Sequence, residues 1–463
     1  MYLFAQENLG VRNGHYAGIQ AALLNPAGME GQSLKWDVNV ASVGMLFDNN
    51  YLYIPRGAVP ILGFKSILRG IKHEDKFVTT FDPANPDKRY HFVLAGEILG
   101  PSFQAEVSPG QVVGFTLAAR AYANIDNFTG HVAQNAYDYM RNKDLWHVPL
   151  HDNSTRLNGM AWLEYGLHYA AVLWKDNESE LAVGVGLKYL EGIGAAYVKN
   201  TNLNYVVGDT ALLSLTGSSL DYGRTNYDNY RKGQRQLNHG HGFAADIGVT
   251  YTRFNDGVAS GHTNTEGAEH WGKWTGKGKS NYLFKLGISV LDPGRIKFSR
   301  NSSQFHLQAD SANFPNWSTY DLKTNAQLDR TISAAFYGGD SAKSQTGSSF
   351  RMGLPAAVSA QADWNCYESF FVNVTIVKGF GHGNRQGVVR PDVYSVTPRY
   401  ESRWVDVSVP FSAIYYGRWR PRLGFAVRVG YFFFGGDAPA GLFKLRNMYG
   451  VDFYAGFHFF SKR

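Results

Sequence analysis

Apolar and polar residues alternate along most of this chain with a period of two. In residues 422–434 the odd positions, from Leu423 to Phe433, are apolar or aromatic, whereas the even ones are mostly glycine, alanine and arginine. Successive side chains of a β-strand point to opposite faces. The segment therefore predicts a strand with one apolar face and one polar face.

The same pattern recurs in segments of ten or more residues separated by turn residues. Soluble sandwiches have strands of about 5–6 residues, whereas longer two-faced strands are typical of transmembrane β-barrels. Asp292-Pro293-Gly294 is expected to form a hairpin turn inside one of these segments. The clearest strand segments are 111–126, 160–174, 181–192, 242–254, 281–298, 354–364, 369–380, 403–416 and 450–460.

Link lengths support a barrel as well, because barrels have short periplasmic turns and longer extracellular loops. Three ambiguous stretches (36–56, 57–89 and 200–240) leave 14, 15 or 16 strands, and an even number is expected. We predict an all-β chain that forms a single transmembrane antiparallel barrel of 14 strands, with 16 as the alternative. Short links are expected at 108–110, 175–180, 292–294, 365–368 and 417–421, and long ones at about 127–157, 256–278, 309–350, 381–395 and 435–449.

Composition excludes several other classes of protein and site. Of the 463 residues, 44% are hydrophobic and 15% aromatic, yet no apolar run reaches the length of about 18 residues that a membrane helix needs. The net charge of +7 is scattered rather than clustered, which argues against a nucleic-acid partner. Cys366 is the only cysteine, which excludes an intrachain disulfide and a four-cysteine zinc site.

Two parts of the sequence resemble known families. LLNPAGME (23–30) is similar to a segment near the N-terminus of the long-chain fatty-acid transporters, which are 14-stranded barrels with an N-terminal hatch. A wider set of segments resembles an uncharacterised Bacteroidota outer-membrane barrel family. These resemblances imply a barrel in the bacterial outer membrane with both termini in the periplasm. The segments of the wider set are 35–54, 186–194, 242–251, 286–298, 354–364, 397–404 and 424–437.

The predicted organisation has three parts. Residues 1–5 are interpreted as a signal-peptide remnant, with a disordered N-terminus as the alternative; residues 6–34 form a hatch or periplasmic segment; residues 35–463 form the barrel. On the resemblance we favour a hatch that plugs the lumen over a mobile periplasmic tail. Its candidate residues are Asn25, Pro26, Ala27 and Gly28.

Charged and polar residues on the predicted polar face are expected to line the lumen. A charge in hydrocarbon costs about 2–4 kcal/mol at the membrane midplane, so inward placement is expected whatever the function. These groups either form salt bridges across the interior or contact a ligand. The candidates are Arg120, Glu164, His168, Lys188, Asp246 and Arg428.

The final strand segment ends in aromatic residues. The resemblance implies that the assembly machinery of outer-membrane barrels recognises it, and a membrane-interface girdle is the alternative. The residues concerned are Tyr454, Phe457, Phe459 and Phe460.

Motifs for catalysis, cofactors and metals are weak. His239-Gly240-His241 has no acid or cysteine beside it in a known metal-binding pattern, and no nucleophile or phosphate-binding signature is present. We expect no enzyme, no cofactor and no metal. The leading hypothesis is binding or passive transport of a small hydrophobic molecule.

The alternative is a non-transporting structural or accessory subunit of an envelope complex, such as a secretion translocon or the barrel-assembly machinery. A barrel enzyme is a third, weaker hypothesis. Expected partners are outer-membrane lipid, lipopolysaccharide, the barrel-assembly machinery, a hydrophobic ligand or envelope-complex proteins.

Overall fold

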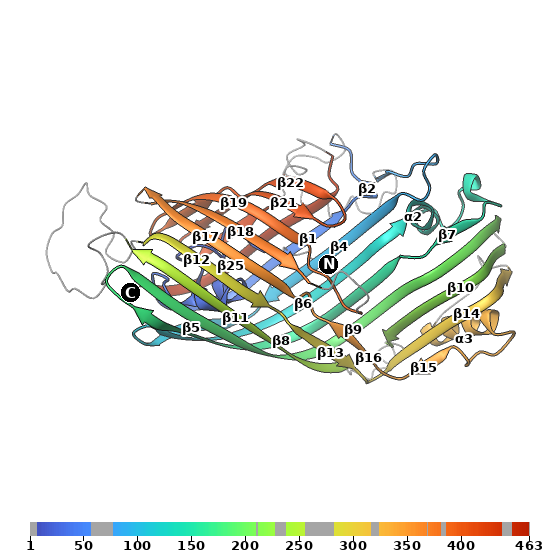
Figure 1. Cartoon of the computed structure of the whole chain (residues 1–463), viewed down its shortest axis with the longest axis horizontal. Coiled ribbons are helices and arrows are strands. Elements are labelled where there is room, and N and C mark those ends of the chain that lie inside the picture. Colours follow the sequence, from blue (N-terminus) through green and yellow to red (C-terminus); the bar gives the residue numbers. More distant parts are fainter. Residues whose placement is uncertain are drawn as a thin grey trace.

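The chain forms a closed antiparallel β-barrel in the computed structural model (Figure 1). Its first long strand, β1 (Leu34–Asn49), pairs along most of its length with its last, β25 (Gly450–Lys462), so the sheet has no free edge there. The structure describes residues 7–56, 77–209, 212–226, 238–254, 282–315, 324–367, 369–380, 386–437 and 447–462.

The wall has 14 strand positions, which confirms the predicted number. Several positions are built from two or three shorter strands that lie end to end. The first half comprises β1; β4 (Arg89–Leu99) with β5 (Ser102–Ser108); β6 (Gln111–Thr129); β7 (Leu150–Asp152) with β8 (Arg156–Lys175); β9 (Ser179–Asp209); β10 (Leu212–Thr225) with β11 (Gly240–Phe254); and β12 (Tyr282–Leu291) with β13 (Gly294–Phe298) and β14 (Ser302–Pro315).

The second half closes the barrel back onto β1. It comprises β15 (Gln345–Gly347) with β16 (Phe350–Gly353) and β17 (Ala357–Tyr367); β18 (Phe370–Gly379); β19 (Asp392–Glu401); β20 (Val405–Ser408) with β21 (Phe411–Tyr415); β22 (Trp419–Leu423) with β23 (Phe425–Val429); β24 (Phe432–Gly436); and β25.

The two ends of the barrel differ. One end, here called the turn end, carries the start of β1, the end of β25 and tight connections such as residues 109–110 and 430–431. The other, the loop end, carries the helices α2 (Gly130–Tyr137), η4 (Lys143–Leu145) and α3 (Asn325–Phe336) and the short pair β2 (Leu52–Tyr53) and β3 (Val78–Thr79) (Figure 1).

No helix in the described ranges is both long and apolar enough to cross a membrane.

Two sequence predictions about turns are wrong. Asp292-Pro293-Gly294 does not reverse the chain, because β12 and β13 both pair with β11, through Ile247↔Val290 and Ala244↔Gly294. The tripeptide is instead an interruption within one wall position, and Asp292 has a φ of +54°.

Residues 422–434 are not one strand either. The chain reverses at Gly430, whose φ is +58°, and Tyr431, between β23 and β24. The reversal changes the phase of the alternation, so Phe433 points inward and is 2% exposed, whereas Phe432 and Phe434 face outward.

Short and long connections do not alternate strictly between the two ends of the barrel, contrary to the prediction from the sequence. The strands beside the long segment 256–278, β11 and β12, meet at the turn end, although the segment itself lies outside the described residues. The short link between β21 and β22, predicted at 417–421, lies among the loop-end connections rather than at the turn end.

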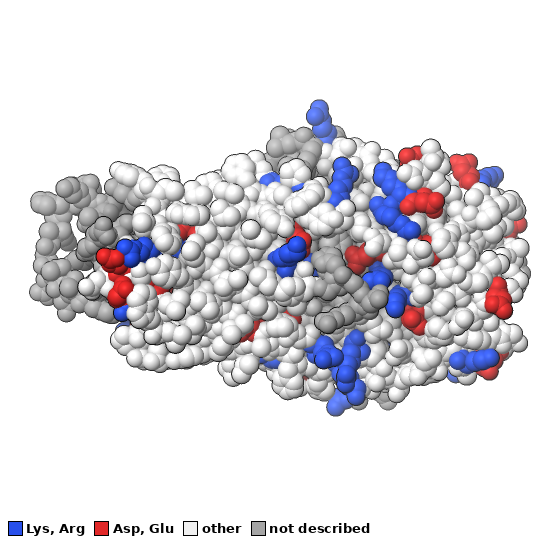
Figure 2. All heavy atoms as spheres, viewed as in Figure 1, with Lys and Arg blue, Asp and Glu red and all other residues white. Residues whose placement is uncertain are grey.

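An uncharged band crosses the visible face of the barrel near its turn end (Figure 2). Figure 2 shows no charged side chains on this face between the turn-end cluster and the loop-end half. Large apolar side chains such as Leu187, Phe243 and Ile288 are exposed in the strands of this region. Trp174 and Trp404 lie near its turn-end margin. An outward apolar band flanked by aromatic residues is the surface that a membrane barrel presents to lipid.

The wall extends past this band on one side. β9 has 31 residues, and its loop-end half pairs with β10, which pairs with β14. An apolar cluster that includes Tyr205, Leu215 and Phe314 packs there against Phe336 of α3. This loop-end extension is therefore stabilised by its own small core.

We expect Leu187→Arg to destabilise the barrel by about 2–4 kcal/mol in lipid vesicles, because the side chain is 66% exposed within the apolar band. Leu212→Arg, on the loop-end extension, is the matched control and is expected to have little effect. Denaturant unfolding from vesicles measures both variants, and equal destabilisation would contradict this placement of the membrane.

Candidate functional site

Residues 7–33, the described part of the predicted hatch, lie inside the barrel and are called the hatch below (Figure 1). Asn25 caps the 3-10 helix η2 (Pro26–Met29) by accepting a hydrogen bond from Ala27 N at 3.0 Å. Its Nδ2 donates to the wall, to Val249 O at 3.2 Å and Gln361 Oε1 at 3.1 Å. One asparagine side chain thus shapes the hatch and attaches it to the barrel.

Glycines in the wall make room for this segment. A β-carbon on Gly184 would overlap the backbone of Pro26 and Ala27, and one on Gly248 would overlap the Asn25 side chain. Both glycines lie in paired strands, opposite each other in the register of β9 and β11. The close approach of η2 therefore depends on the missing side chains.

The other 3-10 helix of the hatch, η1 (Gly18–Leu23), covers an apolar part of the inner wall. This packing is unlike the polar interior of a water-filled barrel. We call these residues the hatch–wall apolar contact. From the hatch they are Ile19, Ala22, Leu23 and Met29, and from the wall Leu99, Val112, Ala118 and Ala170.

Beside this contact the wall is interrupted at Gly100-Pro101, between β4 and β5. Asn39 Nδ2 donates to the carbonyl oxygens of Leu99 and Gly100 at 3.2 and 3.0 Å, which replaces ladder hydrogen bonds. Gln20 Nε2 of the hatch donates to Asn39 Oδ1 at 3.3 Å and to Ser42 Oγ at 2.5 Å. The hatch is therefore bound at an interruption of the wall.

A layer of buried ion pairs crosses the lumen, with Asp292 at its centre. Arg120 donates to both carboxylate oxygens of Asp292 at 3.0 Å, and Lys188 Nζ donates at 2.6 Å. Lys188 also lies 2.6 Å from Asp246 and 3.4 Å from Glu164. Asp292, which the sequence predicted in a turn, therefore joins a cluster of four of the six predicted lumen residues. These are Arg120, Glu164, Lys188 and Asp246.

An inserted loop reaches this layer from the loop end. Residues 386–391, called the inserted loop below, enter the lumen, and Val388 N donates to Gly353 O at 3.1 Å. Arg390 Nη2 donates to Asp292 Oδ2 at 3.0 Å, and its Nε lies 3.7 Å from Glu7 Oε1 of the hatch. The inserted loop and the hatch therefore meet at the ion-pair layer.

The hatch also reaches the layer through Arg12, whose Nη2 donates to Glu97 Oε1 at 2.5 Å. Glu97 in turn lies 3.6 Å from Arg120 Nε. Because these charges are removed from water, each depends on its partners, and loss of one partner would leave an uncompensated charge.

The two remaining predicted lumen residues lie apart from this layer. His168 is buried and contacts Thr116 Oγ1 at 2.9 Å. Arg428 lies towards the turn end, where it forms an ion pair with Asp406 and its guanidinium lies 4.3 Å from the ring of Tyr16 in the hatch. Both side chains point inward, and neither contacts Asp292.

The four C-terminal aromatic residues face in both directions. The rings of Phe457 and Phe459 contact each other on the outer side, and Phe457 also stacks on Phe432. Phe460 instead contacts Tyr16 of the hatch, and buried Tyr454 accepts a hydrogen bond from Gly10 N at 3.1 Å. Half of this set therefore helps to seat the hatch.

Across the described ranges, no group of three or more His, Cys, Asp and Glu residues could hold a metal ion.

We expect Asp292→Asn to lower the free energy of unfolding by about 3–5 kcal/mol, because it leaves buried Arg120, Lys188 and Arg390 short of a counter-charge. Glu178→Gln, which breaks the exposed pair with Arg253, is the matched control and is expected to change little. Denaturant unfolding tests this, and equal effects of the two variants would argue against a central role for Asp292.

We expect Gly184→Val to displace the hatch without opening the wall, because its β-carbon would overlap Pro26 and Ala27. Gly159→Ala is the control, since its β-carbon would make an ordinary 3.7 Å contact with Ala123. Limited proteolysis of folded protein reports the change: cleavage within residues 7–33 is expected to be faster in Gly184→Val alone. Unchanged cleavage would mean that η2 does not depend on this glycine.

Solved structures with a similar arrangement are barrels of low sequence identity. The TodX monoaromatic hydrocarbon channel, as its deltaS2 mutant, gives a TM-score of 0.43 at 8% identity and covers 97% of this chain and 95% of its own. The NalP autotransporter translocator domain from Neisseria meningitidis gives 0.35 at 8%, covering 96% of each chain. The toluene transporter TbuX from Ralstonia pickettii gives 0.32 at 7%, covering 99% and 98%.

The sequence itself matches one family. No curated protein matches it. A family model, described as a family of unknown function (DUF5723), matches residues 26–437, from the start of η2 to the residue after β24. Because the match covers most of the chain, this protein belongs to that family.

Proposed function

We propose that this chain is an outer-membrane barrel that binds a small hydrophobic molecule and lets it pass when the hatch moves. The hatch–wall apolar contact carries this proposal. Barrels that conduct water and ions have polar interiors. Here, withdrawal of Ile19 and Leu23 would uncover an apolar inner surface beside the interrupted strand at Gly100-Pro101.

A second apolar region lies on the loop-end side of the ion-pair layer. Its largest members pack around Trp162, which itself lies against the Arg120 guanidinium at 5.2 Å. The residues include Trp162, Leu190, Tyr197, Phe298 and Phe350. The proposed path begins in this region, crosses the layer when the inserted loop and hatch shift, and ends at the hatch–wall apolar contact.

The ion-pair layer provides the gate in this mechanism. An apolar molecule gains nothing from contact with charges, and separating buried ion pairs is costly. The path is therefore closed until Arg390 leaves Asp292 or Arg12 leaves Glu97. In this mechanism the open arrangement exposes both apolar regions to the ligand, whereas the closed one does not. The ligand therefore binds the open arrangement more tightly, and this difference in affinity supplies the free energy that separates the ion pairs.

The proposed location is the bacterial outer membrane, with the turn end towards the periplasm. A closed barrel with an outward apolar band is the membrane-spanning form typical of outer membranes. Tight turns are concentrated at the end where β1 starts and β25 finishes, as in barrels with both termini periplasmic. That the family comes from Bacteroidota, and that the C-terminal aromatic residues guide assembly, stay predictions.

One observation favours a second candidate, a non-transporting accessory subunit of an envelope complex. The lumen is closed from both sides, since Glu7 of the hatch and Arg390 of the inserted loop meet beside Asp292. A permanently sealed barrel would act through its surfaces, and the loop-end extension would be the surface available.

A reversible crosslink separates the two candidates. Ser289 Oγ of the wall donates to the backbone oxygen Leu24 O of the hatch at 2.7 Å, so the two residues are neighbours across the hatch–wall boundary. In a Cys366→Ser background, oxidation of Leu24→Cys/Ser289→Cys is expected to stop uptake of radiolabelled long-chain fatty acid or toluene by intact cells. Reduction is expected to restore it, because the hatch is then released.

The Leu24→Cys single variant controls for oxidation, since it cannot form this crosslink. Equal uptake in oxidised cells, reduced cells and cells without the chain would rule out transport. Stoichiometric co-purification of other envelope proteins in that case would support the accessory role.

A further inference from the structure

Three exposed cations lie together on the outer face of the barrel wall. Arg295 and Lys297 of β13 and Arg351 of β16 are exposed, whereas Ile296 and Met352, which alternate with them, are buried inside the barrel. Because successive side chains of a strand point to opposite faces, the three cations face outward. They are called the outer basic group below. Figure 2 shows basic side chains gathered over β13 and β16, on the loop-end side of the uncharged band.

The strand register brings these like charges together. Lys297 lies directly opposite Arg351, and Arg295 lies two residues before Lys297 on the same face. Like charges directly opposite each other destabilise a sheet. On its other side Lys297 faces His241, and a carboxylate, Glu191 of β9, follows only two strands away, at about 10 Å for a strand spacing of about 4.8 Å.

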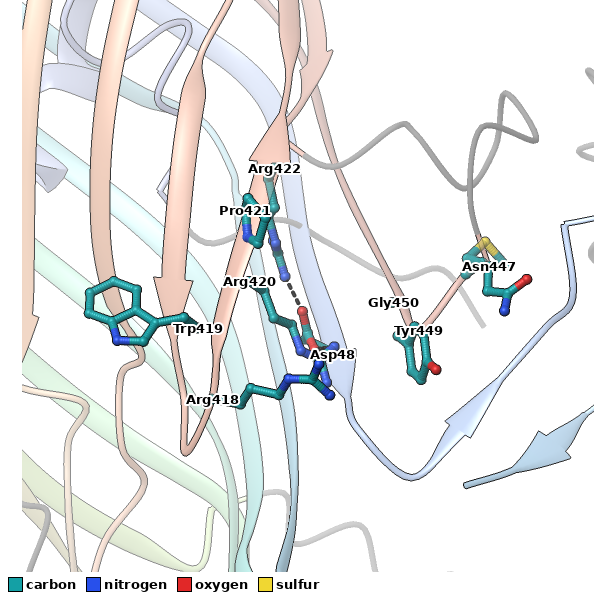
Figure 3. A pocket seen from close by; sticks show the side chains of 10 residues that line it. Asp48, Arg418, Trp419, Arg420, Pro421, Arg422, Asn447, Tyr449 and Gly450 are labelled. Carbon is teal, nitrogen blue, oxygen red and sulfur yellow. Dashed lines mark hydrogen bonds and ion pairs between the residues drawn. The ribbon is translucent and has the colours of Figure 1, made fainter. Parts of the chain in front are cut away.

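No carboxylate compensates the outer basic group. Within the part of the chain that the structure describes, none of its three cations forms an ion pair. The arginines of β22 differ, because they alternate with the exposed side chains of Trp419 and Leu423 and face the lumen. There Arg420 and Arg422 both form ion pairs with Asp48 of β1 (Figure 3). The outer basic group therefore combines outward exposure with charge that has no partner among the described residues.

The outer basic group begins where the apolar band ends. Phe243 of β11, which is 73% exposed, lies opposite Arg295, and His241, the next outward residue towards the loop end, lies opposite Lys297. The rings of His241 and Phe243 lie 6.1 and 5.5 Å from that of Tyr189 on β9. Aromatic rings at the margin of an apolar band mark the level of lipid headgroups. The cations therefore lie at the headgroups of the leaflet at the loop end.

We propose that the outer basic group binds phosphate carried by a lipid headgroup of this leaflet. Arginine and lysine donate charge-assisted hydrogen bonds to phosphate oxygens. Residues two apart on a strand are separated by about 7 Å, and directly opposite β-carbons by about 4.5–5.5 Å, so these long side chains converge on one headgroup. A bound phosphate would also offset the repulsion between Lys297 and Arg351.

The position of the site favours a lipid over free phosphate. Acyl chains of a bound lipid would lie along exposed Phe243 and Ile247 of the apolar band, directly beside the cations. Basic residues at a membrane surface attract anionic lipids. This site lies on the outer face of the wall, so it does not depend on passage of a molecule through the lumen.

The test uses the full-length chain in detergent. Native mass spectrometry measures binding of diphosphorylated lipid A, the same lipid without its phosphates, and inorganic phosphate. Wild type is expected to bind the diphosphorylated lipid about tenfold more tightly than the dephosphorylated one. Lys297→Gln/Arg351→Gln is expected to lose this preference, because the phosphate loses two charged donors. Lys297→Gln alone, expected to weaken the preference, covers the case in which the double variant does not fold.

The matched control removes the same charge from the loop-end extension. Arg330 of α3 and Lys343 are both exposed and lie beyond the apolar band. Arg330→Gln/Lys343→Gln is therefore expected to keep the wild-type preference for the phosphorylated lipid.

The outcomes separate the sources of phosphate. A preference lost in Lys297→Gln/Arg351→Gln and kept in the control supports a lipid headgroup at this site. Binding of inorganic phosphate without a preference between the lipids overturns the lipid source. Equal binding of both lipids by wild type without phosphate binding, equal loss in both double variants, or a wild-type preference in the Lys297 variants overturns the site.

Discussion

The closed state of this barrel depends on one buried carboxylate. Asp292 accepts hydrogen bonds from Arg120 and Lys188 of the wall and from Arg390 of the inserted loop. Arg390 also contacts Glu7, so the wall, the inserted loop and the hatch share one set of charges. Charges removed from water tolerate no missing partner. Loss of any one of these contacts would leave a buried charge without its partner, so the wall, the inserted loop and the hatch depend on one another.

Apolar packing and missing side chains determine where the hatch sits below this layer. Gly184 and Gly248 admit η2, Asn25 attaches it to two wall strands, and Ile19 covers the apolar inner surface. An interruption of the wall, at Gly100-Pro101, lies under the same segment and receives hydrogen bonds from Asn39. The hatch thus covers this interruption, and its movement would change access to the lumen and to this part of the wall together.

The sequence predicts the barrel well because the period-two pattern is repeated along many strands. An error in the bounds of one strand therefore does not change the predicted fold. It predicts which residues point inward, as for Arg120 and Lys188, because a charge that faces lipid is costly. It fails where the backbone departs from the pattern. Asp292-Pro293-Gly294 has the composition of a turn, yet neighbouring strands continue the pairing on both sides, and only the register with β11 reveals this. Arg390 and Glu7 come from segments without periodicity, so nothing in the sequence alone indicates that they meet at Asp292.

The central claim, a lumen closed by ion pairs that join the hatch to the inserted loop, is tested most directly by conductance in planar lipid bilayers. Wild type is expected to show no steady ion current. The Asp292→Asn/Arg390→Gln double variant is expected to open intermittently, because the inserted loop loses its ion pair with the wall. A steady current through wild type, or a double variant that stays closed while folded, would contradict the account.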